Sequence, residues 1–350
     1  MNHNHLVIMA GGVGSRFWPM STPKYPKQFI DVLGCGRTFI QMTLDRFRGI
    51  IPSENVWVVT SKEYQTIVQQ QLPEIPTDHI LLEPCRRNTA PCIAYVSWRI
   101  KKIDAEANLV VTPSDHMVTD VVEFQKVINK SLEFTSQNNA ILTLGMKPTR
   151  PETGYGYIER TNSGNEDKTI YKVAKFREKP DLKTAQEYIQ QQEFYWNSGI
   201  FVWNIQTIVN ALNTYAVEVA AVFEKLDTYL GTSDEQQKVN ELFPTCPSIS
   251  IDYAVMENAS DIFVYPADFG WSDVGTWGSL ITLSDKDSEG NATIGQRIDL
   301  HDCHNCIVHT TEERRVVVQG LDGYIVAEKD DTLLICKLSE EQRIKDFSAE

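Results

Sequence analysis

Short apolar runs alternate with helically spaced segments over the first 150 residues. The runs, such as "HLVIMA", "NVWVVT" and "NLVVTPSD", end in glycine, polar or acidic residues. The segments between them, such as "TFIQMTLDRFRGI" and "VEFQKVINKSLEF", repeat their apolar residues every three or four positions. This alternation predicts an α/β fold with a doubly wound, mostly parallel, Rossmann-like sheet. Ligands of such sheets bind beyond the carboxyl ends of the strands, where the glycines after "LVIMA" and the acidic "PSDH" are expected.

The pattern changes twice further along the chain. Residues 148–204 contain extended segments such as "TIYKVAKFREKP" and "GIFVWN", which we interpret as an insertion built onto the edge of the sheet. Residues 205–262 are mainly helical in pattern. From about Asn291, short β segments separated by Gly, Asp and Asn predict a small all-β module. We therefore expect one large domain at residues 1–285 and a β module at residues 286–350.

The composition and net charge of the chain limit the kinds of molecule that it is expected to bind. The chain has 350 residues, 42% of them hydrophobic, and a net charge of −14, which argues against general binding to nucleic acid or to an anionic membrane. No apolar run approaches the length of a membrane span, and "MNHNHLVIMA" does not resemble a signal peptide. We expect a cytoplasmic protein.

Seven scattered cysteines, an odd number, favour reduced thiols over a disulfide framework. The segment "HDCHNC" places Cys303 and Cys306 beside His301 and His304 and raises the alternative of a metal site. A structural zinc site normally uses a second ligand pair at a distance, and only Cys336 follows. We favour ordinary thiols in a strand-rich tail.

The loop after the first strand, "GGVGSRFWPMSTPKYPKQF", carries cations and no acidic residue. Its first glycines let backbone N–H groups approach a phosphate chain, and Arg16 and Lys27 supply positive charge. The loop lacks the Gly-Lys-Ser/Thr ending of a P-loop, and Phe17 stands where the dinucleotide fingerprint needs a third glycine. These features predict an anion site of another type.

This loop resembles the signature of sugar-1-phosphate nucleotidylyltransferases. Seven further motifs occur in the family's order: "EPCRRNTAP", "PSDH", "PTRPETGYGYIE", "FREKPD", "WNSGIF", "SIDYAVME" and "GWSDVGTW". The "EPCRRNTAP" motif is similar to that of the branch that transfers GMP to mannose 1-phosphate. The resemblance covers residues 6–277 and implies a nucleotidyltransferase domain followed by a short left-handed β-helical module. The chain is too short to hold the phosphomannose isomerase domain of the long members.

The resemblance also implies a set of site residues and a Mg²⁺ cofactor. Arg16, Lys27 and Lys179 are expected to be catalytic, and Asp115 and Asp273 to bind Mg²⁺. Nucleotide binding is assigned to Ala10, Gly11, Gly12, Gly14, Ser15, Arg16, Glu83, Asn88, Thr89 and Ser114. Sugar-phosphate binding is assigned to Gly154, Tyr155, Glu178, Lys179 and Asn197. The implied substrates are GTP and mannose 1-phosphate, and the β module suggests a homodimer.

Several alternatives stay open at this point. Glu83 can accept hydrogen bonds from guanine, or it can pair with Arg86 or Arg87. Trp196, Phe201 and Trp203 are interpreted as core residues, and Lys24 can be a surface lysine. The substrate can be another hexose- or heptose-1-phosphate, or another nucleoside triphosphate. A non-catalytic nucleotide-sugar sensor and a nicotinamide-dependent oxidoreductase are alternatives of other classes, which the complete motif set disfavours.

Overall fold

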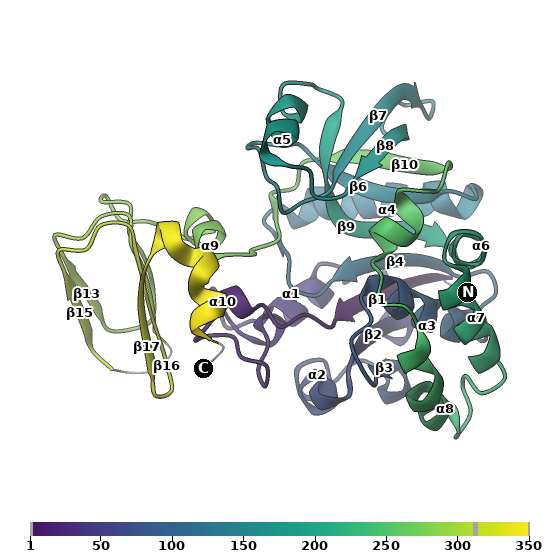
Figure 1. Ribbon diagram of the computed structural model, residues 1–350, viewed down its shortest axis with the longest axis horizontal. Helices are drawn as coiled ribbons and strands as arrows, with labels where there is room; N and C mark the ends of the chain where they lie inside the picture. The colour runs from purple at the N-terminus through teal and green to yellow at the C-terminus, as the bar shows by residue number, and fades with distance from the viewer. Residues whose placement is uncertain (1–2, 311–313, 349–350) are drawn as a thin grey trace. The chain divides into compact units, whose positions relative to one another are not determined.

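The first apolar run forms β1 (Asn4–Ala10), whose residues Leu6, Val7 and Ile8 have no exposed surface. In the computed structural model, which describes residues 3–310 and 314–348, β1 lies within a sheet of nine strands of that part of the chain (Figure 1). A strand that is covered on both faces needs continuous apolar residues, which explains the run. The order across the sheet is β3 (Ile80–Glu83), β2 (Val56–Ser61), β1, β4 (Asn108–Pro113), β9 (Phe194–Asn204), β6 (Ile141–Met146), β10 (Ile262–Ala267), β8 (Tyr171–Arg177) and β7 (Tyr157–Gly164).

The expectation of a mostly parallel sheet is correct for the pairs β3–β2, β2–β1, β1–β4 and β6–β10, whereas the other pairs are antiparallel. Strands β3, β2, β1 and β4 are parallel, so their carboxyl ends share one edge. Strand β9 runs antiparallel to both β4 and β6, and β7 and β8 are antiparallel to their neighbours. "GIFVWN" is therefore part of a central strand and not of an insertion at the rim. Local alternation of strand and helix does not encode strand direction, which the connections and the packing decide.

Contacts group the described residues into two units, each made of three segments of the chain. Unit 1 comprises residues 1–11, 46–113 and 118–271, and unit 2 comprises residues 12–45, 114–117 and 272–350. The short strands β5 (Met117–Val118) and β11 (Trp271–Ser272) lie where the chain passes from one unit to the other. The predicted domains at 1–285 and 286–350 stay a prediction.

Helices cover the sheet of unit 1. Helix α3 (Thr89–Lys101), almost entirely buried, packs with α6 (Ile205–Tyr215) and α7 (Val217–Leu226) in one core with Trp57, Leu109 and Trp203. Helix α4 (Val121–Gln137) begins at its N-cap Asp120 and packs against β4, β6 and β9. The other helices of this unit are α2 (Gln65–Gln71), α5 (Leu182–Tyr188) and α8 (Glu235–Leu242). Among the described helices none is long and apolar enough to cross a membrane.

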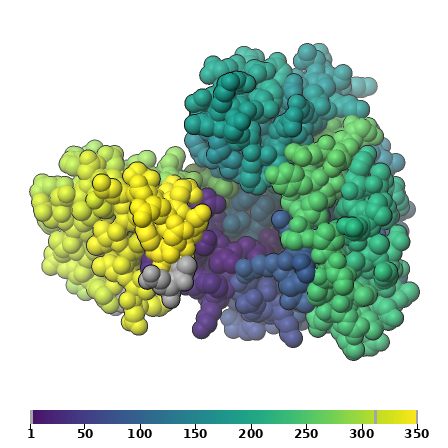
Figure 2. Space-filling view, in the orientation of Figure 1, coloured from purple at the N-terminus to yellow at the C-terminus, as the bar shows by residue number. Residues whose placement is uncertain are grey.

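Unit 2 contains the β-rich C-terminal region. Strands β12, β14 and β16 pair in parallel, as do β13 and β15, and β17 closes the larger sheet antiparallel to β16. Figure 2 shows the region, in yellow-green to yellow, as one continuous surface. The bounds are β12 (Ala292–Ile294), β13 (Ile298–His301), β14 (Ile307–Thr310), β15 (Val316–Gln319), β16 (Tyr324–Lys329) and β17 (Thr332–Lys337), with helices α1 (Phe39–Asp45), α9 (Trp277–Leu283) and α10 (Ile344–Phe347).

The glycine-rich loop and the β-rich region share one hydrophobic core. Phe17 and Met20 of the loop pack in the same cluster as Trp277, Ile307 and Ile325. Polar contacts reinforce this packing, because the Lys329 ammonium donates to the Met20 carbonyl at 2.7 Å and lies 5.0 Å from the centre of the Tyr25 ring. Burial lowers the pKa of Lys329. The last strands of the chain thereby support a loop near its beginning.

We expect Lys329→Met to lower the free energy of unfolding by about 1–3 kcal/mol, because the buried carbonyl of Met20 loses a charged donor. Lys337→Met, an exposed lysine on β17, is the control and should change stability by less than about 0.5 kcal/mol. Denaturant unfolding followed by tryptophan fluorescence measures both. Equal midpoints for the two variants would show that Lys329 does not support the loop.

Candidate functional site

The loop of unit 2 is shaped by close backbone packing. Gly14 has a left-handed φ of 67°, and a Cβ there would lie only 2.5 Å from Cβ of Lys27. A single 3₁₀ turn, Ser15–Phe17, follows, and the Phe17 N–H donates to the Gly14 carbonyl at 3.0 Å. Only glycine combines this backbone conformation with this approach, so the fold itself requires glycine at position 14.

Lys27 is a buried cation at the centre of unit 2. It is 2% exposed, and its Nζ lies 2.9 Å from Oδ2 of Asp115, 2.8 Å from the Asp273 carbonyl and 2.9 Å from the Val274 carbonyl. Three ammonium protons thus meet three oxygens. Lys27 therefore joins the loop to the two segments that carry the predicted metal-binding aspartates, and its charge reaches a ligand mainly as an electrostatic field.

A cavity of about 250 Å³ in unit 2 brings the predicted cations and carboxylates together. Burial would raise the pKa of Asp115, but the charge of Lys27 outweighs it and holds that pKa below its ordinary value. Oδ1 of Asp273 accepts a hydrogen bond from the Gly275 N–H at 3.0 Å. Both side chains therefore have fixed orientations. The cavity is lined by Gly14, Ser15, Arg16, Lys27, Asp115, His116, Asp273 and Gly275.

The residues of this cavity suit a Mg²⁺ ion that arrives with a nucleotide. Mg²⁺ prefers carboxylate and phosphate oxygens and is commonly held by one or two carboxylates plus substrate phosphates. Asp115 and Asp273 supply two carboxylates on one cavity. No group of three or more His, Cys, Asp or Glu side chains in the described residues is arranged to hold a metal without further ligands. The donor set fits a metal that is completed by substrate.

A second cluster of predicted residues lies in unit 1. The Lys179 ammonium pairs with the Glu178 carboxylate, and the Asn197 amide donates to Oδ1 of Asp252 at 2.9 Å. Oδ1 of Asn197 accepts from the Thr143 hydroxyl at 3.1 Å, which fixes the orientation of the amide. The structure thus brings the adjacent residues Glu178 and Lys179 together with Asn197 and adds Asp252, which the sequence analysis did not select.

The pKa values of this cluster reflect burial and like charge. Desolvation, followed by the negative charge of Glu178, raises the pKa of Asp252 to about 6. Burial lowers the pKa of Lys179, but its hydrogen bond to Glu178 outweighs this, so the pKa rises above its ordinary value. Asp252 begins a π-helical turn, Asp252–Met256, a rare conformation that is frequent at functional sites. The cluster has the perturbed titration expected of a binding site.

Glycine and aromatic residues surround this cluster. A Cβ on Gly156 would lie 2.6 Å from Oε2 of Glu178, so "TGYG" needs glycine for this close approach. Tyr155 packs edge-on against Trp196 and Trp271, with ring centroids 5.3 and 5.4 Å apart. The Gly154 N–H donates to Glu152 at 3.1 Å. Burial of Trp196, Phe201 and Trp203 confirms that these three aromatic residues belong to the core.

The residues predicted to bind the base also lie in unit 1. Glu83 ends β3 and is 6% exposed, and no ion pair joins it to Arg86 or Arg87 in the part of the chain that the structure describes. Arg86 instead donates to the Tyr64 hydroxyl, and Arg87 to the Pro244 carbonyl. Other residues predicted to bind the nucleotide make hydrogen bonds within the protein. The Asn88 side chain accepts from the Thr89 N–H, and the Thr89 hydroxyl accepts from the Ile251 N–H. The Ala10 carbonyl accepts from the Thr60 hydroxyl and, in unit 2, the Ser114 carbonyl accepts from the Thr43 hydroxyl.

The "HDCHNC" segment occupies turns of the β-rich region. The Cys303 and Cys306 thiols donate to the carbonyls of Val318 and Leu321, at 3.5 and 3.4 Å. All seven cysteines are free thiols. In this structure the two thiols of the segment serve to bridge successive turns of the chain.

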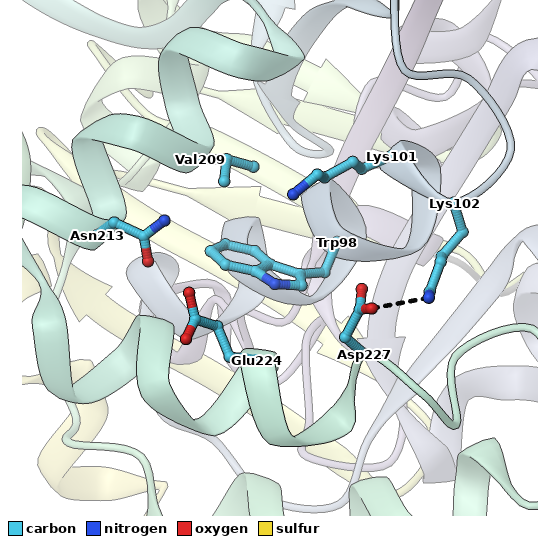
Figure 3. A pocket seen from close by; sticks show the side chains of 7 residues that line it. All are labelled: Trp98, Lys101, Lys102, Val209, Asn213, Glu224 and Asp227. Carbon is cyan, nitrogen blue, oxygen red and sulfur yellow. Dashed lines mark hydrogen bonds and ion pairs between the residues drawn. The ribbon is translucent and has the colours of Figure 1, made fainter.

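A second cavity, of about 400 Å³, lies among α3, α6 and α7 of unit 1 (Figure 3). Trp98 lies at its centre, and Lys102 and Asp227 form an exposed ion pair of 2.8 Å at its side. No residue that the sequence analysis selected lines it. Its other side chains are Lys101, Val209, Asn213 and Glu224.

The fold and both clusters define the class of protein. Residues 5–290 match the family model described as nucleotidyl transferase. The chain belongs to the nucleotidyl transferase family, as its motifs predicted.

Its relatives are more specific. The mannose-1-phosphate guanylyltransferase of Salmonella montevideo is 37% identical over 345 residues, which are 97% of this chain and 72% of the relative. The protein of that name from Escherichia coli K12 is 36% identical over 97% of this chain and 71% of its own length. A crystal structure from Thermus thermophilus, described as a mannose-1-phosphate geranyltransferase, has a TM-score of 0.88 and 29% identity and covers 99% of this chain and 98% of its own.

Two residues escaped the sequence analysis. Asp252 lies inside the quoted motif "SIDYAVME" and His116 inside "PSDH", so their motifs were the available signal. His116 lines the cavity of unit 2, with Nε2 3.9 Å from Oδ1 of Asp115. Gly156 lies inside the quoted motif "PTRPETGYGYIE", and the structure adds its proximity to Glu178.

The raised pKa of Asp252 predicts a stability effect. Between its ordinary value of 3.8 and about 6, the unfolded chain has lost this proton while the folded protein retains it. The contribution of Asp252 to stability therefore falls as pH rises through this window. We expect Asp252→Asn to gain up to about 2 kcal/mol relative to the natural protein from about pH 4 to about pH 6.

Denaturant unfolding at a series of pH values measures this difference. Asp261→Asn, which changes a carboxylate that is 73% exposed, is the control and should show no such trend. Parallel stability curves for Asp252→Asn and the natural protein would contradict the buried, raised titration of Asp252.

Proposed function

We propose that the protein transfers GMP from GTP to α-D-mannose 1-phosphate, giving GDP-mannose and pyrophosphate. The observation that supports this most directly is the cavity of unit 2, where Arg16, Lys27 and two carboxylates meet beside the glycine-rich loop. The names of relatives that align with 97% of the chain point to the same reaction.

The reaction needs charge stabilisation and positioning more than acid–base catalysis. A phosphate oxygen of the sugar phosphate, already ionised near neutral pH, forms a bond to the α-phosphorus of GTP. The bond from that phosphorus to the bridging oxygen breaks, and pyrophosphate leaves with the electron pair. Aligned reactants and fixed positive charge account for most of the rate in such transfers.

Unit 2 supplies the groups for the triphosphate. In our proposal the N–H groups around Gly11, Gly12, Gly14 and Ser15 approach the phosphates, and the exposed Arg16 guanidinium binds their oxygens in a bidentate manner. Lys27 lines the cavity, but its three protons already meet protein oxygens, so in our proposal it acts on the phosphates through its charge. It holds Asp115 ionised and in position.

Asp115 and Asp273 would hold the Mg²⁺ ion. When bound, the ion neutralises negative charge on the phosphates. The groups that orient these carboxylates belong to the chain itself: the Lys27 ammonium pairs with Asp115, and the Gly275 backbone N–H donates to Asp273. Ser114 precedes Asp115 and is 2% exposed, so its proposed contribution to the nucleotide site is made through the backbone.

Unit 1 supplies the groups for the sugar phosphate and the base. Lys179 is the proposed partner of the sugar phosphate, and Glu178 and Asn197 are the proposed partners of sugar hydroxyls beside Gly154 and Tyr155. Asn197 is suited to this role because Asp252 and Thr143 fix its amide. Glu83, Asn88 and Thr89 are the proposed residues of the base site.

A substrate panel tests the reaction. The purified protein is incubated with Mg²⁺, each common nucleoside triphosphate and each of several hexose and heptose 1-phosphates, and pyrophosphate release is measured. We expect the highest kcat/KM with GTP and mannose 1-phosphate. Faster turnover of another pair of substrates would change the proposed substrates but not the proposed type of reaction. Binding of nucleotide sugars without turnover would identify the protein as a sensor.

Lys27→Ala should reduce turnover in this assay by about 10²–10³, the usual loss when one preorganised charge-stabilising group is removed. Lys24→Ala, an exposed lysine of the same loop, is the matched control and should keep nearly full activity. Circular dichroism establishes that both variants are folded. Unchanged turnover of folded Lys27→Ala would remove Lys27 from the catalytic residues.

We further propose that the β-rich region is a short left-handed β-helix that pairs two copies of the chain, and that the enzyme works in the cytoplasm, where its free thiols stay reduced. On β17, Leu333 and Ile335 are 58% and 56% exposed, while the alternate residues Leu334 and Cys336 are buried. This edge strand thus presents an apolar face that a second copy would cover.

Light scattering after size-exclusion chromatography tests the dimer. The natural protein should have about twice the 39.8 kDa mass of one chain, and Ile335→Lys should shift it towards the monomer. Lys337→Met leaves the apolar pair intact and serves as the control. A monomeric natural protein would contradict the proposal.

A further inference from the structure

Glu83 is a buried carboxyl group with unused hydrogen-bonding capacity. It stands at the carboxyl end of β3, is 6% exposed, and its Oε1 has no hydrogen-bond partner among the described residues. A Cβ added to Gly11 would lie 3.8 Å from its Oε2, so the carboxyl group lies beside the start of the glycine-rich segment that follows β1. Buried polar atoms are rarely left unpaired, and an unpaired one at this edge of the sheet indicates a ligand.

The groups that face Glu83 do not hold it ionised. Burial raises its pKa to about 8, and the hydrogen bond from the Cys92 thiol and the charge of Arg86 only partly oppose this. Tyr95 lies on the same helix as Cys92. Burial, with a contribution from the charge of Glu83, raises the pKa of Tyr95, so this side chain is neutral and does not stabilise an ionised Glu83 by charge. The Arg86 guanidinium donates a hydrogen bond to the Tyr64 hydroxyl at 3.1 Å. Burial therefore favours the protonated form of this carboxyl group in the free protein.

The ionised and the protonated form of a carboxyl group are complementary to different purine bases. A carboxylate offers two acceptors, which match the N1–H and N2–H donors of guanine. A carboxylic acid offers one donor and one acceptor, which match the N1 acceptor and the N6–H donor of adenine. The same side chain thus complements either base, and one proton decides which.

We propose that the protonation state of Glu83 sets the purine specificity of this site, so that ionised Glu83 selects GTP and protonated Glu83 accepts ATP as an alternative substrate for AMP transfer. The reaction in this proposal is the one given under the proposed function. The specificity is inferred from the burial of Glu83 and from its unpaired Oε1. Binding of GTP then releases a proton from Glu83, whereas binding of ATP does not.

The expected effect follows from the populations of the two forms. About half of the molecules carry ionised Glu83 at about pH 8, and roughly one in a hundred at about pH 6. The apparent affinity for a ligand falls with the fraction of protein in the competent form. The preference for GTP over ATP should therefore fall by up to about tenfold for each pH unit below about 8.

The experiment measures the dissociation constants of GTP and ATP by competition with one fluorescent nucleotide, and kcat/KM for both with mannose 1-phosphate, from about pH 6 to about pH 8. The GTP/ATP ratio is the readout, because ionisation of the triphosphate affects both nucleotides alike. Glu83→Gln, whose amide has one donor and one acceptor, should favour ATP and give a ratio that does not vary with pH. Glu224→Gln, an exposed residue of the cavity in Figure 3, should behave as the natural protein does.

Arg86→Gln gives a second test that keeps the Glu83 carboxyl group. Loss of the positive charge should raise the pKa of Glu83 further and move the change in ratio to higher pH. A ratio of dissociation constants that stays constant with pH in the natural protein overturns the proposal. Because this binding ratio does not depend on the sugar, it decides the proposal even if the substrate panel identifies another sugar phosphate.

Discussion

The buried ammonium of Lys27 is the interaction on which unit 2 depends. An unpaired cation in the interior is strongly unfavourable, so the fold must bring oxygens to it. The oxygens come from Asp115 and from the carbonyls of Asp273 and Val274, which lie on two distant segments of the chain. Folding of the loop therefore requires the same assembly that places both carboxylates on one cavity.

This constraint explains the absence of acidic residues from the first thirty positions. A carboxylate within the loop would compete with Asp115 for Lys27 and would repel a triphosphate. The acids that the chemistry requires are supplied instead from other segments, each held by a partner: Asp115 by Lys27 and Asp273 by Gly275. The loop provides cations, and the later segments provide the carboxylates that we propose as metal ligands.

In unit 1, by contrast, carboxyl groups are removed from water without enough hydrogen bonds or positive charge to offset the cost of desolvation. Asp252 lies beside Glu178, and Glu83 retains an unpaired oxygen, so both have raised pKa values. Such groups reduce stability, and they are suited to recognising hydroxyl groups and bases. Several residues of unit 1 that the motifs suggested have structural contacts too, as the N-cap Asn88 shows.

The sequence alone determined the α/β class, the first four parallel strands and the family, because apolar runs, glycine loops and motifs are local properties. It also identified Lys27, Asp115 and Asp273 as belonging together. The direction of β9, the place of "GIFVWN" in the centre of the sheet, the burial of Lys27 and the roles of Asp252 and Gly156 were decided by tertiary structure alone. These features depend on which segments meet in space, and a contact such as that between Gly156 and Glu178 leaves no mark on either local pattern.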